Sequence, residues 1–546
     1  MGTASSSGGA SAWSPFRSQT FASMWSAQFV SNVGGWMQTV GAQELMLTLT
    51  TSAAPVALIQ TAASLPIVLF AVPAGTVGDL VDRRRLLIVA QSFALLAAVA
   101  LGVLALAGLV TPWLLLGLIF ATGAGQAFTA PTWQTLQPEL VPPADRPQAI
   151  ALGSVNMNLG RAVGPAIGGA LYAATSAGTL FLVNAASFVP VIGVVARWQG
   201  RARAASAVAP EHVRQATRAG ARYVAASPAL RVILLRAALF MFFANAIWAL
   251  LPLVARARLH LGSGGYGFLL AGVGIGAVVG AALLPRVRGR LAPSALVTVG
   301  TAGLAGLALV LATVRIAAVD AAVLGIGGFA WILVLSTLSS QYQSTLPGWV
   351  KARGLAYYLV VFQGGGALGS TAFGFAAQSA GLRTALLATA AGLAAVAVGG
   401  AMLPFQAIRP EELLPAADWP APQLAGDATA AGPVLVTIEY RPQPGREHDL
   451  LAALYAARYG RRRTGATSWR RWQDAADPGR ILEEFVVGSW DDHLRQHERV
   501  SLRDQQRLDE IKAMTDPSRP PIVTHWIAPA DEGSTHDESQ PPGGRS

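Results

Sequence analysis

Long apolar stretches separated by short polar breaks fill the chain from Phe21 to Leu403. A helix that spans a bilayer needs about 20 mostly apolar residues, and the charges, prolines and glycines between the stretches divide this region into segments of that length. The pattern therefore predicts an all-α, polytopic membrane region. Its twelve expected transmembrane helices lie at residues 21–49, 54–77, 84–110, 112–136, 147–173, 179–198, 228–255, 263–285, 292–314, 318–345, 353–377 and 382–404.

The composition agrees with a membrane protein, because 53% of the residues are hydrophobic and only 13% are charged, against about a quarter charged in soluble domains. The chain has no cysteine, which excludes disulfides, thiolate metal sites and cysteine nucleophiles. It also has no phosphate-binding loop of the GxxxxGK[ST] type, and the glycine strings that begin at Gly272 and Gly364 lie in apolar helices, where small residues favour close packing. We therefore expect an ion gradient to supply energy, and we predict no cofactor and no metal.

Arginine and lysine gather on one side of the predicted helices. That side holds residues 83–85, the linker at 199–227 and the end of the last helix, whereas the opposite side holds only Arg256, Arg258, Arg315 and Arg383. Since positively charged short loops stay in the cytoplasm, we expect both termini there and a multi-pass location in the cell (inner or plasma) membrane. This asymmetry accounts for the net charge of +11, so no nucleic-acid partner is predicted. Residues 1–20 have no signal-peptide pattern, and we interpret them as a disordered tail.

An internal repeat indicates two halves. The segment LQPELVPPADRPQAIALGSVNMNLGRAVGPAIGG, from Leu136, is echoed by STLPGWVKARGLAYYLVVFQGGGALGSTAFG, from Ser344. Both run from a proline through a valine and a basic loop into a helix rich in small residues. Such half-repeats are typical of transporter folds, so we predict six-helix halves at residues 21–198 and 228–404.

The segment PAGTVGDLVDRRRLL, between the second and third helices, resembles the loop signature of the major facilitator superfamily. On this match Gly75 and Asp79 take the glycine and aspartate positions, and Arg83 and Arg84 the basic pair, although Leu80 stands where the family often has arginine. The resemblance implies the superfamily's fold and a gating latch between the halves at these four residues. The alternative is that the charges serve only as topology signals.

Two longer segments narrow the resemblance. SNVGGWMQTVGAQELMLTLTTSAAPVALIQTAASLPIVLFAVPAG and LPGWVKARGLAYYLVVFQGGGALGS are similar to the branch that contains enterobactin exporters and transmembrane secretion effectors, over about residues 16–405. This resemblance implies a secondary transporter that exports a small molecule, a siderophore, metabolite or drug, by alternating access and usually with proton entry. Uptake remains an alternative, because the fold does not set the direction.

Ionisable residues inside the bilayer are costly and usually face a cavity or a partner. Glu44 is the leading candidate for proton coupling, or else a hydrogen-bonded glutamate near the interface. Arg161, with Asn158 three residues earlier on the same helix face, suits an anionic or polar substrate group, a proton-linked carboxylate, or a tie to a neighbouring helix. We expect Arg236 to snorkel to the surface and Asp320 to touch water.

The first predicted helix also has a polar face, formed by Gln28, Asn32 and Gln38. These amides either line a central cavity or form hydrogen bonds between helices, and the spacing alone leaves both interpretations open.

The chain changes character after Pro404. Residues 405–432 are a Pro/Ala-rich linker, residues 433–529 read as a soluble domain of order βαββαβ with its last helix running through Met514, and residues 530–546 form a disordered tail. This order is that of a small α+β, ferredoxin-like domain.

The soluble domain is similar to the cofactor-free antibiotic-biosynthesis monooxygenases, which are dimeric barrels. The resemblance implies self-association, and Trp469, Trp472, His493 and His497 are the candidates for a pocket. His493 and His497 share a helix face, but no third metal ligand is evident. The main expectation is a transporter that is not an enzyme, and a monooxygenase-like enzyme anchored to or fed by the membrane region is the competing hypothesis.

Overall fold

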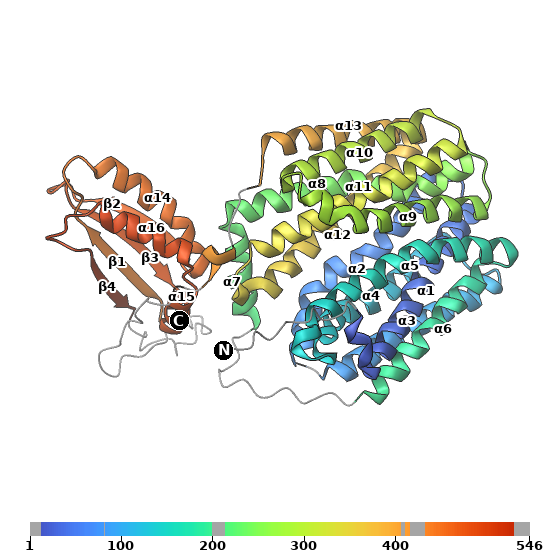
Figure 1. The fold of residues 1–546 in the computed structure, drawn as a ribbon, viewed down its shortest axis with the longest axis horizontal. Coiled ribbons are helices and arrows are strands. Elements are labelled where there is room, and N and C mark those ends of the chain that lie inside the picture. The colour runs from blue at the N-terminus through green and yellow to red at the C-terminus, as the bar shows by residue number, and fades with distance from the viewer. Residues whose placement is uncertain are drawn as a thin grey trace, which may run out of the picture. The chain divides into compact units, whose positions relative to one another are not determined.

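The computed structural model describes residues 13–80, 82–198, 213–405, 410–414, 416 and 432–528, and the chain divides into two compact units (Figure 1). The helical unit comprises Met1–Pro210, Val232–Gln343 and Leu355–Gln406. The sheet unit comprises Glu211–Arg231, Ser344–Gly354 and Ala407–Ser546. Each is described by itself below.

Long helices in two sets form the helical unit. The first half contains α1 (Gln19–Leu49), α2 (Ala53–Leu80), α3 (Arg83–Leu106), α4 (Pro112–Leu136), α5 (Arg146–Ala174) and α6 (Ala177–Arg197), with short 3-10 helices at Ser14–Arg17, Gln137–Leu140 and Pro143–Asp145. The second half contains α8 (Pro228–Leu253), the π-helix η4 (Val254–Arg258), α9 (Ser263–Arg288), α10 (Pro293–Thr313), α11 (Ala317–Ser344), α12 (Lys351–Ala380) and α13 (Leu382–Met402).

Ten helices of the described chain are long and apolar enough to cross a membrane. The helices α1 and α5 have sufficient length but do not reach the required hydropathy. Both carry ionisable and amide side chains, among them Glu44 in the last third of α1 and Arg161 in the middle of α5. The structure thus establishes a mainly helical, multi-pass membrane protein. Of the twelve predicted spans, α1 and α5 are the two polar ones, and they are not among these ten helices.

Amide side chains tie α1 to its neighbours. Gln28 donates to Asn32 Oδ1 (3.1 Å), and Asn32 donates to Asn156 Oδ1 of α5 (2.8 Å). Further along α1, Gln38 Oε1 accepts a hydrogen bond from Asn184 of α6 (2.6 Å). Buried amides need such partners, so the polar face noted in the sequence forms hydrogen bonds within the first half.

The two ends of the helical unit differ in their connections. The loops at residues 50–52, 107–111, 175–176, 259–262, 314–316 and 381 are short and lie at one end, here called the short-loop end. The loops at residues 137–145 and 289–292, together with the starts of α1 and α8, lie at the other, the linker end.

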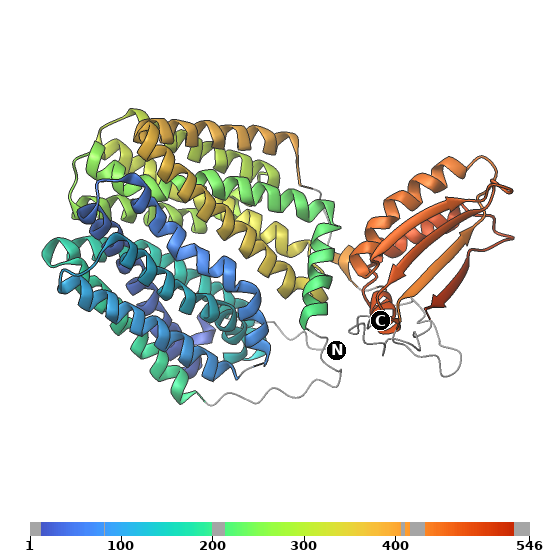
Figure 2. The same ribbon diagram turned by 180° about the vertical axis from the view of Figure 1, so that it is seen from behind.

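A four-stranded antiparallel sheet in the order β2-β3-β1-β4 forms the centre of the sheet unit. Its strands are β1 (Val434–Tyr440), β2 (Ser468–Gln473), β3 (Ile481–Val487) and β4 (Ile522–Ile527), and its helices are α14 (Glu447–Thr464), α15 (Trp490–Glu498) and α16 (Leu502–Ala513). Residues alternate in burial along β1 and β3, and the helices cover one face while the other stays open (Figure 2). The four strands lie within the predicted domain, residues 433–529, and in the predicted order along the chain.

The last predicted helix of this domain is two helices rather than one. The break falls at Arg499–Ser501, and the Ser501 hydroxyl accepts a hydrogen bond from the backbone N–H of Asp504 (3.3 Å). A serine in this position caps the first turn of a helix, which explains why α16 starts anew at Leu502.

The sheet unit also includes two segments from earlier in the chain, α7 (Val213–Ala225) and the turn around η5 (Gly348–Val350). The Trp349 ring packs edge-on against Tyr223 (5.5 Å between centroids), and the Arg499 guanidinium lies 4.4 Å from its centroid. A further 3-10 helix, η6 (Pro410–Leu413), precedes the sheet. The unit is therefore assembled from three separate stretches of sequence.

Candidate functional site

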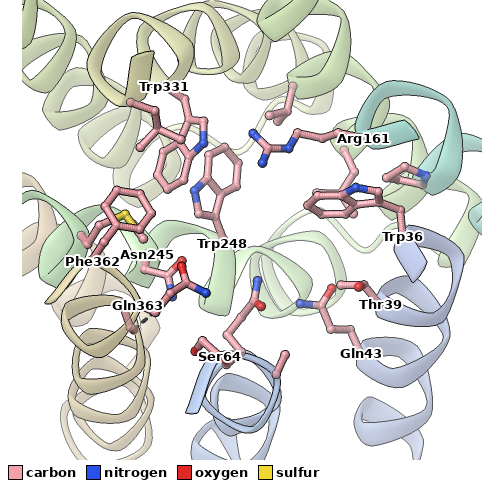
Figure 3. A pocket seen from close by; sticks show the side chains of 18 of the residues that line it. Trp36, Thr39, Gln43, Ser64, Arg161, Asn245, Trp248, Trp331, Phe362 and Gln363 are labelled. Carbon is pink, nitrogen blue, oxygen red and sulfur yellow. Dashed lines mark hydrogen bonds between the residues drawn. The ribbon is translucent and has the colours of Figure 1, made fainter. Parts of the chain in front are cut away.

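A cavity of about 250 Å³ lies between the two halves of the helical unit. Its wall combines aromatic and polar side chains from several helices of both halves (Figure 3). The lining residues are Trp36, Thr39 and Gln43 of α1, Gln60, Ala63 and Ser64 of α2, Arg161 and Pro165 of α5, Met241, Asn245 and Trp248 of α8, Tyr266, Leu270 and Val273 of α9, Trp331 and Leu335 of α11, and Phe362, Gln363 and Gly366 of α12.

Arg161 is the only ionisable side chain besides Tyr266 among these lining residues. Its guanidinium points from α5 into the space between Trp36 and Trp248 (Figure 3), and its Cζ lies 5.3 Å from the centroid of the Trp36 ring. A cation over an indole face is favourable. The Arg161 Nε is nevertheless buried without a hydrogen-bond acceptor in the described part of the chain.

Aromatic rings form the wall that the second half contributes. Trp248 and Trp331 meet edge-on, with centroids 5.1 Å apart at 87°. Like Arg161, Trp248 has a buried donor, its Nε1, for which the described residues supply no acceptor. The Asn245 side-chain amide, by contrast, connects α8 to α12. It donates to the Gly366 carbonyl (3.0 Å) and the Ser370 hydroxyl (2.8 Å).

Contacts between the halves close the cavity toward the short-loop end. Tyr266 donates to Gln43, joining α9 to α1. The Thr61 hydroxyl donates to the Ala367 carbonyl (3.0 Å) and lies 2.9 Å from that of Thr371, joining α2 to α12. Both pairs lie on the portions of these helices nearest the short loops, so that end is sealed.

Glu44 lies beyond this seal and not in the cavity wall. It is 3% exposed, and its electrostatic neighbour is Arg256 of η4. The nearby positive charge therefore belongs to the second half, whereas the carboxylate belongs to the first.

Asp320 is a buried carboxylate that the sequence interpretation placed in contact with water. That expectation is wrong: the side chain is 0% exposed, and neither carboxylate oxygen has a hydrogen-bond partner in the described residues. Arg258, the second arginine of η4, is its charged neighbour. Only the Asp320 face of the first turn of α11 is buried, whereas Ala318 and Val319 of the same turn are exposed.

Arg236 does not snorkel as expected. It is buried and donates to the hydroxyls of Ser294 (2.7 Å) and Thr298 (3.3 Å), while the Phe405 ring lies 4.3 Å from its Cζ. These partners belong to α10 and to the chain after α13, so Arg236 serves as a structural tie.

The predicted loop signature is described only in part. The side chains of Gly75, Asp79 and Asn158 lie outside the described residues, although α2 and α5 contain their positions. Arg84 donates to the carbonyl of Ala196 in α6, and Asp82 accepts from the Arg85 backbone N–H (2.9 Å), capping α3. Arg83 is half-buried.

In the sheet unit, the four predicted pocket residues separate. Trp469 faces the helices and donates to Glu483 (2.8 Å), whereas Trp472, three residues along the same strand, is on the opposite face and half exposed. His493 and His497 lie together, with their Nε2 atoms 3.3 Å apart. An odd separation along a strand reverses the face, so one pocket does not collect all four.

Sequence reasoning missed His525 of β4, whose ring lies 4.8 Å from that of His493. Burial lowers the pKa of His493 to about 4 and lowers the pKa of His525 as well. Within the part of the chain that the structure describes, no three His, Asp or Glu side chains are arranged to hold a metal ion.

The family described as transmembrane secretion effector matches residues 10–533. The chain belongs to this family of the major facilitator superfamily. Among curated relatives of this secretion-effector chain is the Staphyloferrin A transporter of Staphylococcus aureus, 31% identical over 162 residues, which are 29% of this chain and 41% of the relative. The chain thus aligns with less than half of that transporter's length.

Solved structures share the fold of this family member. A mutant of the nucleoside transporter NupG superposes with a TM-score of 0.59 at 13% identity, covering 70% of this chain and 100% of its own. A mutant of the E. coli Fucose:proton symporter, FucP, gives 0.50 at 16% identity, covering 70% and 98%. At such identities the likeness establishes the transporter fold alone.

The cavity residues that sequence reasoning missed include five aromatic ones: Trp36, Trp248, Tyr266, Trp331 and Phe362. A usable signal was present, because tryptophan in membrane proteins is enriched at the two interfaces, whereas Trp331 lies in the middle of α11. Tryptophan at mid-membrane depth is a pointer to a cavity.

Proposed function

We propose that this protein is a secondary active transporter that exports a small molecule across the cell (inner or plasma) membrane by alternating access. The observation that carries the proposal is the cavity between two helical halves, sealed toward the short-loop end by Tyr266–Gln43 and Thr61–Thr371. In this proposal the chain has twelve spans, with α1 and α5 included, so both termini lie on the same side, and the arginine and lysine asymmetry of the loops supports the cytoplasm as that side and as the side of the linker end. The structure then represents a state that receives substrate from the cytoplasmic side.

The substrate is a small metabolite, siderophore or drug. The relative named as a Staphyloferrin A transporter supports the siderophore among these. Gly75, Asp79, Arg83 and Arg84 act as the latch between access states, and Asp79→Asn slows transport while leaving the protein inserted.

Proton entry drives export, and Glu44 is the coupling residue. Its burial beside Arg256, on the side of the seal away from the cavity, supports a carboxyl that takes up a proton from outside. A charged carboxylate in this position strengthens the contact between the halves, and protonation weakens it. Opening of the seal is thereby linked to the outside pH.

Inverted vesicles test direction and coupling together. With an acidic lumen, wild-type vesicles are expected to accumulate substrate from a panel of siderophores and organic acids. Glu44→Gln, which mimics the protonated carboxyl, abolishes gradient-driven accumulation but preserves substrate binding. Asp320→Asn is the matched control, a second buried carboxyl at the same end. Unchanged gradient dependence in Glu44→Gln contradicts the coupling role, and accumulation only with the opposite gradient contradicts export.

The C-terminal domain, ferredoxin-like and similar to the small monooxygenases, self-associates and tunes transport in this proposal. Support comes from the open face of the sheet, where Trp472, Ile522 and Trp526 are 50%, 62% and 59% exposed. Apolar patches of this kind mark protein contacts. Light scattering on residues 433–529 is expected to show a dimer, and a monomer contradicts the idea.

A further inference from the structure

We infer that the cavity between the halves binds its ligand as an organic anion, with a carboxylate placed between Arg161 and Trp248 and an unsaturated or aromatic body against the tryptophans. The inference rests on the proposed function, because it names the chemical class of the transported molecule. It follows from the donors, the charge and the rings of the cavity wall.

The first observation is a pair of unsatisfied donors. Arg161 Nε and Trp248 Nε1 are buried, and neither has an acceptor in the described residues. Guanidinium and indole N–H groups donate and do not accept, and buried donors without partners are rare in native proteins. Because Arg161 points into the space beside Trp248 (Figure 3), a ligand with acceptor oxygens there satisfies both.

The second observation is an uncompensated charge. The lining residues include no Asp, Glu, Lys or His. Glu44, the carboxylate nearest in sequence to the lining residue Gln43, has Arg256 as its neighbour. An unpaired buried cation favours an anion and disfavours a cation.

The third observation is the shape of the wall around the guanidinium. The centroid of the Trp36 ring lies 5.3 Å from the Arg161 Cζ, so the ring supports one side of a guanidinium that can meet a carboxylate with two parallel hydrogen bonds. Trp248 and Trp331 cross at 87°, so they offer both an edge and a face to a flat group. Phe362 and Leu335 add apolar surface to the wall.

Three probes of one shape and different charge test the inference on the purified full-length protein in detergent: phenylacetate, phenylacetamide and phenethylammonium. Binding is followed through the fluorescence of the cavity tryptophans and by calorimetry. The expected order of affinity is phenylacetate, then phenylacetamide, then phenethylammonium. Arg161→Gln is expected to weaken phenylacetate by roughly 10- to 100-fold, the effect of losing a charged hydrogen-bond partner, and to leave phenylacetamide nearly unchanged.

Two further variants sharpen the test. Trp248→Phe retains an aromatic ring and removes the N–H. It is therefore expected to weaken the binding of phenylacetate by a few-fold and to keep the order of affinity for the three probes. Arg236→Gln removes a buried arginine that already has partners, and the preference for phenylacetate should survive in it. Circular dichroism confirms that each variant is folded.

Three results would each overturn the inference: equal affinity for phenylacetate and phenylacetamide, absence of phenylacetate binding up to millimolar concentration, or a preference for phenylacetate that persists in Arg161→Gln. The proposed function fails differently. If phenylacetate binds through Arg161 but vesicles transport no anion, only the transport proposal is contradicted. If vesicles transport cations and the protein binds no anion, only the anion site is contradicted.

Discussion

Each unit of this protein buries an arginine beside an aromatic ring, but the two arginines have opposite surroundings. In the sheet unit, Arg461 donates from Nε and Nη2 to the two oxygens of Glu483, both at 3.2 Å. Tyr440 (2.9 Å) and Trp469 (2.8 Å) donate to the same carboxylate. In the helical unit, the described residues give Arg161 the Trp36 ring and no carboxylate.

The difference separates a charge that the fold neutralises from one for which the described residues supply no carboxylate. The Arg461–Glu483 pair is neutralised within the fold, and it raises the pKa of Arg461 despite burial. Arg161 has no such partner among the described residues, so folding leaves a desolvated charge in the cavity. A buried cation that the protein does not neutralise is available to a ligand, and this contrast can be tested in both units.

The largest effect is expected from Glu483→Gln, which makes Arg461 resemble Arg161. Removing one partner of a buried ion pair typically costs about 3–5 kcal/mol. The hydrophobic cluster of the sheet and its helices lies within residues 434–527, so urea unfolding of residues 433–529 measures the loss. Glu484→Gln is the control: its partner Arg470 is 3.8 Å away and 67% exposed, and such pairs contribute at most about 1 kcal/mol. Similar losses in both variants would contradict the contrast.

The next prediction compares the two buried arginines of the helical unit. Arg161→Met removes an uncompensated charge and should leave the thermal stability of the ligand-free protein unchanged or raise it. Arg236→Met removes the hydrogen bonds to the hydroxyls of Ser294 and Thr298 and should lower the free energy of unfolding by about 1–3 kcal/mol. Thermal unfolding of both proteins in the same detergent decides the matter, and greater loss in Arg161→Met would make that residue a structural tie.

The smallest effect concerns pH in the sheet unit. The pKa of His493 is about 4 in the fold and about 6.5 in an unfolded chain. Between these values the unfolded state binds a proton that the folded state does not, so stability falls as pH is lowered from about 6.5 toward about 4. The loss reaches up to about 2 kcal/mol at about pH 4.5.

Urea titrations of residues 433–529 across this range measure the slope. His493→Gln should flatten it, with His525 leaving a remainder in the same direction. His448→Gln, near the start of α14 and away from this cluster, should leave it unaltered. A slope that survives in His493→Gln would assign the proton to another group.

Sequence patterns predicted the elements well, and the site less well, for a physical reason. Apolar length and strand alternation are local properties, so the helices and the strands were accessible. Arg161 was found because a charge in a membrane helix is conspicuous. Trp248 and Trp331 were missed because apolar aromatics fit both a core and a cavity, and only the packing of α8 against α11 distinguishes the two.

Local patterns also cannot choose a partner across the fold. Gln28 and Asn32 suited a cavity as well as a helix contact until Asn156 was seen beside them. His525 lies far from His493 in sequence, and the register of β4 on β1 brings it next to α15. Each outcome depends on which elements become neighbours.

The contact between α5 and α9, which belong to different halves, is made of residues with almost no side chain. A Cβ on Gly274 would collide with Ala162, and one on Gly267 would come within 2.8 Å of the Gly169 Cα. Side chains do not interdigitate at such a surface. The two helices can therefore slide past one another with few rotamer changes and little loss of dispersion contacts. If the protein works by the proposed alternating access, we expect the activation barrier for exchanging access states to lie at the polar seal of Tyr266 and Thr61, and a bulkier residue at Gly274 to change the turnover rate before it changes affinity.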